Sequence, residues 1–232
     1  MAPITEQILA PIKPDASEDF VNSVLDSNTQ TLLAQPGCLR VRRSRVLENP
    51  NQMCLFVDWA SIEDHQAFAA NAAVYGPFRA HNGTVVDPDV PRVRPYHVSF
   101  APFPPAVLDV ENPGTKANVA ELLHTYFPAD IGEAQREEVE KTIRALAEEV
   151  GKLADGYTGE MALGWSVEDD VLFKDEPSRV LVVVFGWTSV EAHMEARKAE
   201  GSAKVVPMLL NLEGLKGMEV CHVTCTTSER GS

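Results

Sequence analysis

Hydrophobic and polar positions along the chain switch between a period of two and a period near 3.6, and this order predicts strands and helices. In the first half, short alternating or continuously apolar stretches are separated by two longer stretches with apolar residues at helical spacing. The expected elements lie, in chain order, at residues 4–14, 16–37, 38–51, 53–59, 61–74 and 93–102. Their order is β-α-β-β-α-β, that of a ferredoxin-like unit.

The second half of the chain shows the same order after a proline-rich linker at residues 101–106. We expect its elements at residues 107–112, 131–154, 157–169, 179–187, 189–210 and 214–225. The sequence therefore predicts two domains, a first ferredoxin-like α+β barrel repeat over residues 1–104 and a second over residues 105–232.

A short motif repeats within the two halves. "WASIEDH" begins at Trp59 and "WTSVEAH" begins at Trp187, so Trp, Ser, Glu and His recur at the same four offsets. "PYHVSF" and "VCHVTC" align in the last strands. Capping boxes are expected at the two helix starts, from Ser61 to Asp64 and from Thr188 to Glu191. The repeated motif favours a duplicated scaffold over a catalytic sequence used twice.

A single ferredoxin-like unit covers one face of its sheet with helices and leaves the other face apolar, and that face must be buried. Two such sheets in one chain can bury each other. The expected fold class is thus α+β, a tandem ferredoxin-like arrangement that forms a dimeric α+β barrel type of architecture within one chain. The protein would be a monomer, as a pseudo-dimer, or a homodimer.

Charge narrows the possible partners. The formal net charge is −14 and the sequence pI is about 4.8, which argues against binding to nucleic acid or to an anionic membrane surface. No apolar run approaches the roughly 20 residues needed to cross a bilayer, and the N-terminal segment lacks the pattern of a signal peptide. The four cysteines form no C-x-x-C pair, which is typical of free thiols in a reducing compartment. A cytoplasmic protein is expected.

Two histidines are the candidate catalytic residues. His65 shares a helix face with Ile62 and Ala69, so it is expected to point into the space between helix and sheet. His97 lies in the last strand of the first half, and a buried neutral imidazole there could accept a proton from a phenol. The alternative for both is a structural histidine that bonds to backbone. On the second repeated helix, His193 and Arg197 share a face, and an arginine there suggests a wet second cavity.

Arginines are the other unusual feature of the first half. In "RVRRSR", Arg43 and Arg45 lie on one strand face and Arg40 and Arg42 on the other. Arg43 is the candidate to hold an anionic group of a substrate, with ion pairs to acidic residues as the alternative. Trp165 falls opposite this run in the second repeat and is a candidate aromatic wall. If there is one active site, we expect it in the first repeat.

Residues 75–81 are expected to form a loop that gates this cavity, with Tyr75 and Phe78 as contacts to the substrate, or else a plain surface loop. The histidines are scattered, with no metal-binding pattern, and no glycine-rich dinucleotide loop occurs. No cofactor and no metal are therefore expected, although sequence does not exclude haem.

The junction "FVDWASIEDHQAFAANAAVYGPF" resembles the antibiotic biosynthesis monooxygenase family of the dimeric α+β barrel superfamily. The second copy, from Val182 to Ala203, resembles it more weakly, and "LLHTYFPADIGEAQREEVEK" is similar to a segment of tandem fungal members. The superfamily includes cofactor-free oxygenases, polyketide cyclases and haem proteins. The resemblance implies substrate contacts from Trp59 and Asn71, as in anthrone-type oxygenases, whereas the histidine of the family's cyclases is absent here.

The resemblance implies, as the expected function, cofactor-independent monooxygenation of an aromatic polyketide or phenolic intermediate of specialised metabolism. Polyketide cyclisation, isomerisation or decarboxylation in the same pocket is the first alternative. The second is a non-catalytic ligand-binding or stress protein, because a fold alone does not determine a chemistry.

Overall fold

The computed structural model describes residues 2–92, 94–199 and 201–230, and its chain divides into two compact units. Unit 1 runs to Val98 and also contains the segment from Cys225 onward, and unit 2 comprises Ser99–Thr224. The two repeats expected from the sequence meet at residue 104, six residues after the end of the first segment of unit 1. The C-terminal segment joins unit 1 because its strand pairs with a strand of that unit.

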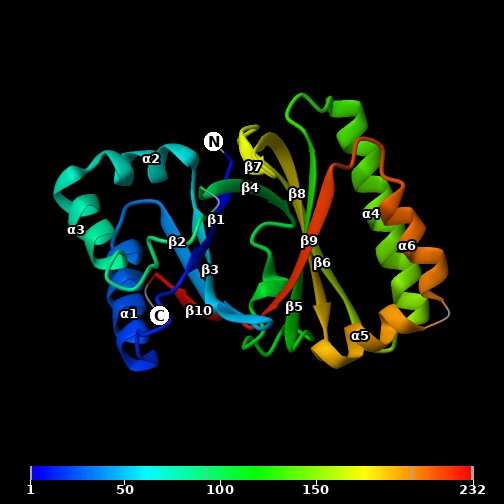
Figure 1. Cartoon of the computed structure of the whole chain (residues 1–232), viewed down its shortest axis with the longest axis horizontal. Helices are drawn as coiled ribbons and strands as arrows, with labels where there is room; N and C mark the ends of the chain where they lie inside the picture. Colours follow the sequence, from blue (N-terminus) through cyan, green and yellow to red (C-terminus); the bar gives the residue numbers. More distant parts are fainter. Residues whose placement is uncertain (1, 93, 200, 231–232) are drawn as a thin grey trace. The chain divides into compact units, whose positions relative to one another are not determined.

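Unit 1 is an antiparallel sheet with helices on one face (Figure 1). Its elements are β1 (Ile4–Pro11), α1 (Glu18–Leu33), β2 (Cys38–Val46), β3 (Asn49–Trp59), α2 (Ile62–Ala70), α3 (Ala72–Asn82), β4 (Tyr96–Ala101) and β10 (Thr226–Glu229). The strand order is β10-β2-β3-β1-β4. Without β10, this is the order 4-1-3-2 of a ferredoxin-like unit, so the fold class expected from the sequence is confirmed.

Local sequence explains where the helices of unit 1 begin. The hydroxyl of Ser17 accepts a hydrogen bond from the backbone N–H of Phe20 and caps α1. The hydroxyl of Ser61 accepts from the N–H of Asp64 at 3.2 Å and caps α2, which is one of the two hydrogen bonds of the predicted capping box. Each cap satisfies a backbone donor that the first turn of a helix leaves unpaired.

The segment after α2 differs from the expected loop. The helix breaks at Asn71, and residues 72–82 form the separate helix α3, which contains Pro77. A proline inside a helix removes one backbone hydrogen bond. The rings of Tyr75 and Phe78 pack edge-on against Phe68 of α2, with centroids 5.2 and 5.3 Å from that of Phe68. This packing stabilises the helical conformation of α3.

Unit 2 has the same topology. Its elements are a 3-10 turn η1 (Ala106–Leu108), β5 (Val119–Pro128), α4 (Glu133–Leu153), β6 (Tyr157–Ser166), β7 (Val171–Phe173), β8 (Glu176–Trp187), α5 (Val190–Lys198), α6 (Ser202–Leu210) and β9 (Gly217–Val223). The strand order β6-β8-β5-β9 is again 2-3-1-4, and β7 adds a short strand to β8. Helices α4, α5 and α6 cover one face of this sheet (Figure 1).

Two expectations for unit 2 are wrong in detail. Residues 107–112 were expected to form its first strand, but Val107 and Leu108 are buried residues of the 3-10 turn η1. The first strand of the unit is β5, further along the chain. The cap of α5 is Ser189, whose hydroxyl accepts from the N–H of Ala192, and not Thr188. Ser189 is thus the counterpart of Ser61.

The main apolar clusters of both units lie between sheet and helices. In unit 1, Trp59, Val57 and Leu32 belong to such a cluster, and in unit 2 Ile143 and Leu181 do. Among the helices of the described residues, none is both long and apolar enough to cross a membrane.

Candidate functional site

Four side chains form a compact polar group in unit 1, which we call the first histidine group: Glu6, Trp59, His65 and His97. His65 Nδ1 lies 2.7 Å from His97 Nε2, and His65 Nε2 lies 3.5 Å from a carboxylate oxygen of Glu6. The indole N–H of Trp59 donates to the same carboxylate at 3.3 Å. The Trp59 ring also stacks on His65 with centroids 5.1 Å apart.

Strand register and helix capping bring these residues together. Glu6 of β1 is directly opposite His97 of β4, so their side chains lie on the same face of the sheet. Trp59 ends β3, and Ser61 caps α2 two residues later. His65 therefore lies in the first turns of α2, on the face towards the sheet, as its spacing predicted.

Unit 2 contains the same arrangement, the second histidine group: Glu121, Trp187, His193 and His222. The two ring nitrogens of His193 and His222 are 2.8 Å apart, and His193 Nε2 lies 3.5 Å from Glu121. Trp187 donates to Glu121 at 2.8 Å and stacks on His193 at 4.6 Å. The repeated "W-x-S-x-E-x-H" motif is thus the visible part of a repeated side-chain group.

A cavity of about 600 Å³ opens beside the first histidine group, between the sheet and the helices of unit 1. Its aromatic wall consists of Phe68, Tyr75 and Phe78, and Glu6 and His65 line it. Polar and apolar residues complete the lining: Ile8, Ala10, Leu25, Asn28, Thr29, Leu32, Val41, Met53, Leu55, Val57, Arg79, Asn82, Gly83, Val86, Asp87, Pro88, Val90, Pro91, Arg92 and Pro95. Its volume lies within the range of about 300 to 1,000 Å³ usual for small-molecule sites.

The candidate residues of the first repeat differ in their position relative to this cavity. His65, Tyr75 and Phe78 line it. His97 is buried behind His65 and is held by it. Trp59 was expected to contact the substrate, but it is fully buried and stacks between His65 and Phe68, outside the lining. Asn71 is exposed at the junction of α2 and α3, where the chain changes direction, and it does not line the cavity.

Arg43 and Trp165, the other two candidates, also lie outside the cavity lining. Arg43 is half-buried and forms an ion pair with Asp26 of α1, so a neighbouring helix supplies its anionic partner. Trp165 belongs to unit 2, where its ring packs edge-on against Phe127 and its indole N–H donates to Glu140 at 3.0 Å. Both residues have protein partners that account for their positions.

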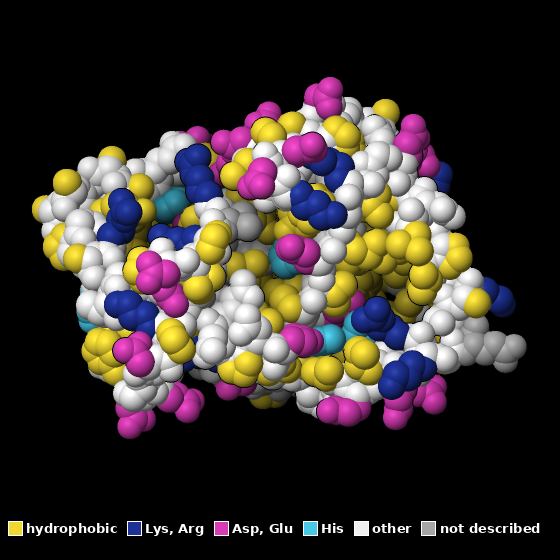
Figure 2. Space-filling view, viewed as in Figure 1, with side chains coloured by type: hydrophobic (Ala, Val, Ile, Leu, Met, Phe, Trp, Pro, Cys, Tyr) yellow, Lys and Arg dark blue, Asp and Glu magenta, His cyan; other side chains and the backbone are white. Residues whose placement is uncertain are grey.

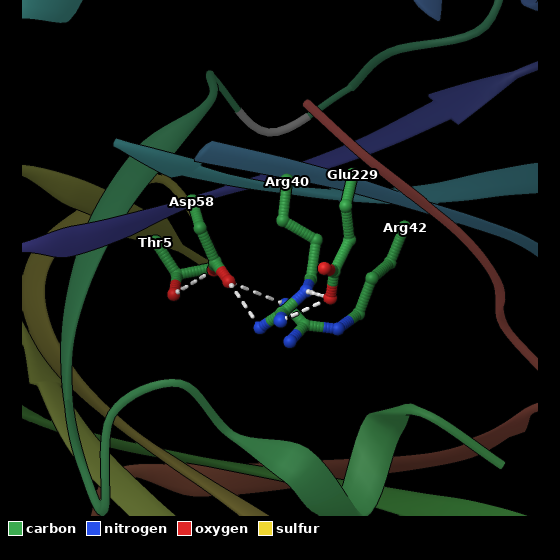
Figure 3. A network of polar contacts seen from close by, with 5 residues as sticks. All are labelled: Thr5, Arg40, Arg42, Asp58 and Glu229. Carbon is green, nitrogen blue, oxygen red and sulfur yellow. Dashed lines mark hydrogen bonds and ion pairs between the residues drawn. The ribbon is translucent and has the colours of Figure 1, made fainter. Parts of the chain in front are cut away.

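The arginine that is fully buried is Arg42, on the opposite strand face. Its guanidinium bonds to the carboxylate of Asp58 at 2.8 Å, and the hydroxyl of Thr5 donates to the same carboxylate at 2.7 Å. Arg40 lies on the same strand, with its guanidinium 3.5 Å from the carboxylate of Asp58. It also forms an ion pair with Glu229 of β10 (Figure 3). A buried charge needs such partners, so this network is structural and ties the C-terminal strand to unit 1.

The sequence interpretation missed the acidic member of each histidine group. Glu6 and Glu121 are both the third residue of the first strand of their unit. A glutamate on the buried face of an apolar strand is itself a signal, because a carboxylate there requires partners. The interpretation also missed Asn28, whose amide donates to Asn82 at 2.8 Å in the cavity wall.

The described residues include no cluster of three or more His, Cys, Asp or Glu side chains that could hold a metal ion. None of the four cysteines, all of which the structure describes, forms a disulfide. Burial raises the pKa of the Cys38 thiol to about 12, so it is protonated at neutral pH and is a poor nucleophile. Within the first histidine group, His65 and Glu6 are the acid–base side chains that line the unit 1 cavity, and His97 contacts His65 behind them.

Residues 3–75 match the model of the antibiotic biosynthesis monooxygenase family. The matched segment contains β1 through α2 and therefore three members of the first histidine group. The expected resemblance to this family is confirmed for that segment. No curated protein sequence is significantly similar to the chain.

Solved structures share the fold over almost the whole chain. An anthrone oxidase-like protein superposes with a TM-score of 0.62 at 12% identity, covering 100% of this chain and 95% of its own. A proposed monooxygenase from Lactobacillus acidophilus NCFM gives 0.56 at 10% identity, with coverage of 100% and 98%. A mutant chlorite dismutase from Candidatus Nitrospira defluvii gives 0.53 at 11% identity, with coverage of 96% and 91%. At these identities the likenesses show a shared fold.

Proposed function

We propose that this chain, which carries an antibiotic biosynthesis monooxygenase domain at residues 3–75, is a monooxygenase that oxidises a phenolic aromatic compound, such as an aromatic polyketide intermediate, without a cofactor. The observation that carries the proposal is the hydrogen-bonded pair of His65 and His97 beside Glu6, at the edge of a cavity with an aromatic wall. The likeness to an anthrone oxidase-like protein supports the same substrate class.

The cavity suits a flat aromatic ligand. Phe68, Tyr75 and Phe78 present ring faces and edges, which favour offset or edge-on contact with another ring. Asn28 and Asn82 offer amide groups to phenol or ketone oxygens, and Arg79 adds a positive charge 6.0 Å from the ring of Tyr75. These groups would orient the substrate by hydrogen bonds and leave its acidic C–H bond towards His65.

Within the proposal, His65 is the general base. When its Nδ1–H donates to His97 Nε2, its Nε2 is free of a proton and can accept one from the substrate. The imidazolium that forms is stabilised by the carboxylate of Glu6, 3.5 Å away. Trp59 holds that carboxylate by its indole N–H and holds the imidazole by stacking. His97 and Trp59 are thus positioning residues.

The chemistry balances without an added reductant. Removal of a proton from a phenol-activated methylene gives a carbanion, which passes an electron to O₂, and the resulting radicals combine into a peroxide. The peroxide takes the proton back from His65 and becomes a hydroperoxide. Loss of the second methylene hydrogen with cleavage of the O–O bond releases water and leaves a ketone, so that CH₂ and O₂ become C=O and H₂O.

Oxygen uptake with anthrone as the probe tests the proposed function. We expect O₂ consumption and quinone formation in equal amounts, faster than in a reaction without protein. His65→Gln should lower the rate at least about 100-fold, because general-base catalysis contributes factors of about 10² to 10⁴. His193→Gln, the matched change in unit 2, should leave the rate unchanged.

Other outcomes assign other functions. A changed product without O₂ consumption would indicate a cyclase, an isomerase or a decarboxylase in the same cavity. Binding of the aromatic compound without any change in it would indicate a binding protein. Equal loss of rate in His65→Gln and His193→Gln would contradict the assignment of the reaction to unit 1.

A further inference from the structure

Unit 2 contains a cavity of its own beside the second histidine group. It has a volume of about 250 Å³ and lies between the sheet, α4, α5 and α6. Its walls are apolar: Leu123, Leu146, Val150, Leu153, Ala154, Phe185, Trp187, Ala196, Val205, Val206, Leu209, Leu210, Met218 and Val220. Glu121, His193, Arg197 and Ser202 are its polar residues.

The difference from the unit 1 cavity has a structural cause. Helix α4 has 21 residues whereas α1 has 16, and the longer helix adds Val150 and Leu153 to the wall. Where unit 1 has the amides of Asn28 and Asn82, the helices of unit 2 contribute mainly aliphatic side chains. The second cavity is therefore smaller and more apolar, and it favours a smaller and more apolar ligand than the unit 1 cavity.

Apolar surface at the rim of this cavity is exposed. Leu210 is 60% exposed, Val206 45% and Leu153 41%, and all three line the cavity. Figure 2 shows a hollow among hydrophobic side chains between the sheet of unit 2 and α6. Grouped exposed hydrophobic side chains around a hollow are a feature of ligand sites.

Among the described residues that line the cavity, Arg197 is the one arginine or lysine. It lies on α5, one helical turn after His193, on the same face of the helix. Among the residues that the structure describes, none forms a hydrogen bond or ion pair with Arg197. The Arg197 side chain is exposed and lines the cavity, so its guanidinium can meet a ligand anion there.

Glu121, the acidic residue among the described lining, does not compete for Arg197. The carboxylate of Glu121 accepts the indole N–H of Trp187 at 2.8 Å and faces His193 at 3.5 Å. Its charge is thus held within the second histidine group. A ligand anion would meet the guanidinium of Arg197, and its apolar part would meet the aliphatic walls.

We propose that unit 2 is a second ligand site, which binds a small apolar carboxylate such as a medium-chain fatty acid. The carboxylate pairs with Arg197, and the alkyl chain lies among residues such as Leu146, Leu209 and Met218. This site is separate from the unit 1 cavity and does not depend on the function proposed for it, because its test is binding and not turnover.

Methionine methyl signals give a separate readout for each cavity. Met218 lines the unit 2 cavity and Met53 lines the unit 1 cavity. With ¹³C-methyl-methionine label in the full chain, octanoate should shift the Met218 signal in a saturable way and leave the Met53 signal in place. Octanol, which has the same chain without the charge, should bind about fivefold more weakly, as expected for loss of one exposed charge pair. Met218→Leu and Met53→Leu identify the two signals.

The matched variants are Arg197→Gln and Arg79→Gln. Both residues are exposed cavity arginines on helices, so neither change disturbs a core. Arg197→Gln should weaken octanoate binding about fivefold and leave octanol binding unchanged. Arg79→Gln should leave both unchanged at Met218.

Three results would overturn the proposal. A Met218 signal that does not move with octanoate would show that the cavity takes no such ligand. Equal shifts of Met218 and Met53 would show general hydrophobic binding. A Met218 shift that follows protein concentration without any ligand would assign the apolar rim to contact with a second copy of the chain.

Discussion

Glu6 and Glu121 show how one buried acid organises each pair of histidines. Each carboxylate accepts an indole N–H and faces a histidine Nε2, and the other nitrogen of that histidine is held by a second imidazole. A buried carboxylate is costly unless its oxygens are paired. Here the partners are the indole and the imidazole that complete each histidine group, so stability and the arrangement of the acid–base groups rest on the same contacts.

His124 is a buried histidine outside both groups, and it makes stability depend on pH. Burial lowers its pKa from 6.5 to about 4, so the unfolded chain binds the proton more readily than the folded one. The stabilisation is fully present above pH 6.5 and is lost as pH falls towards 4. It amounts to about 3 kcal/mol at its largest.

Urea unfolding of His124→Leu tests this prediction. Between about pH 7 and about pH 4.5, the free energy of unfolding of the variant should fall by less than that of the unchanged chain, by about 2 kcal/mol. A fall of the same size in both proteins would contradict the assignment.

At the scale of elements, the turn that enters β2 sets the position of α2. Gly37 adopts a positive φ of 78°, and a Cβ there would lie 2.3 Å from the side chain of Asp64. Its carbonyl also accepts the N–H of Ala60, just before the cap of α2. Gly156 repeats this close approach in unit 2, where a Cβ would lie 2.4 Å from Ala192.

Gly37→Ala should therefore destabilise the protein by about 2 kcal/mol, because it adds both a backbone penalty and an overlap. Thermal unfolding measures the change. Gly76→Ala is the matched control within α3, where a Cβ would meet nothing within 4 Å, and it should be neutral or stabilising by up to about 1 kcal/mol. Equal effects of the two substitutions would refute this account of the turn.

Particular elements show how far the sequence predicts the molecule. The period of the pattern predicts β1, β3, α4 and β8 well, because each has a long apolar face, and the spacing on α2 predicts the direction of His65. The strand β5 was missed because nine consecutive buried residues carry no alternation, and Glu121 was missed with it. Asn28 and Asn82 come from different helices, and no local pattern relates them.

At the scale of the whole molecule, the chain contains two ferredoxin-like units with one kind of side-chain group and two different cavities. The unit 1 cavity is larger and partly polar, whereas the unit 2 cavity is smaller and apolar. The C-terminal strand β10 returns to unit 1 and pairs with β2, and Glu229 pairs with Arg40. Both ends of the chain are therefore needed to complete unit 1.

Native mass spectrometry and an absorption spectrum of freshly purified protein test the proposal that the protein works without a bound cofactor. We predict a mass equal to whole copies of the chain alone and no absorption band in the visible range. The native mass also shows whether the protein is a monomer or a homodimer. A mass or band of haem, flavin or metal would contradict this prediction, and the histidines would then have to be considered as ligands.

The central claim is that His65 removes a proton from the substrate in the unit 1 cavity. Exchange of the methylene hydrogens of anthrone with deuterated solvent, followed by NMR in the absence of O₂, measures that step alone. We predict that the protein accelerates the exchange, that His65→Gln reduces it to the rate without protein, and that His193→Gln has no effect. Undiminished exchange in His65→Gln would contradict the claim.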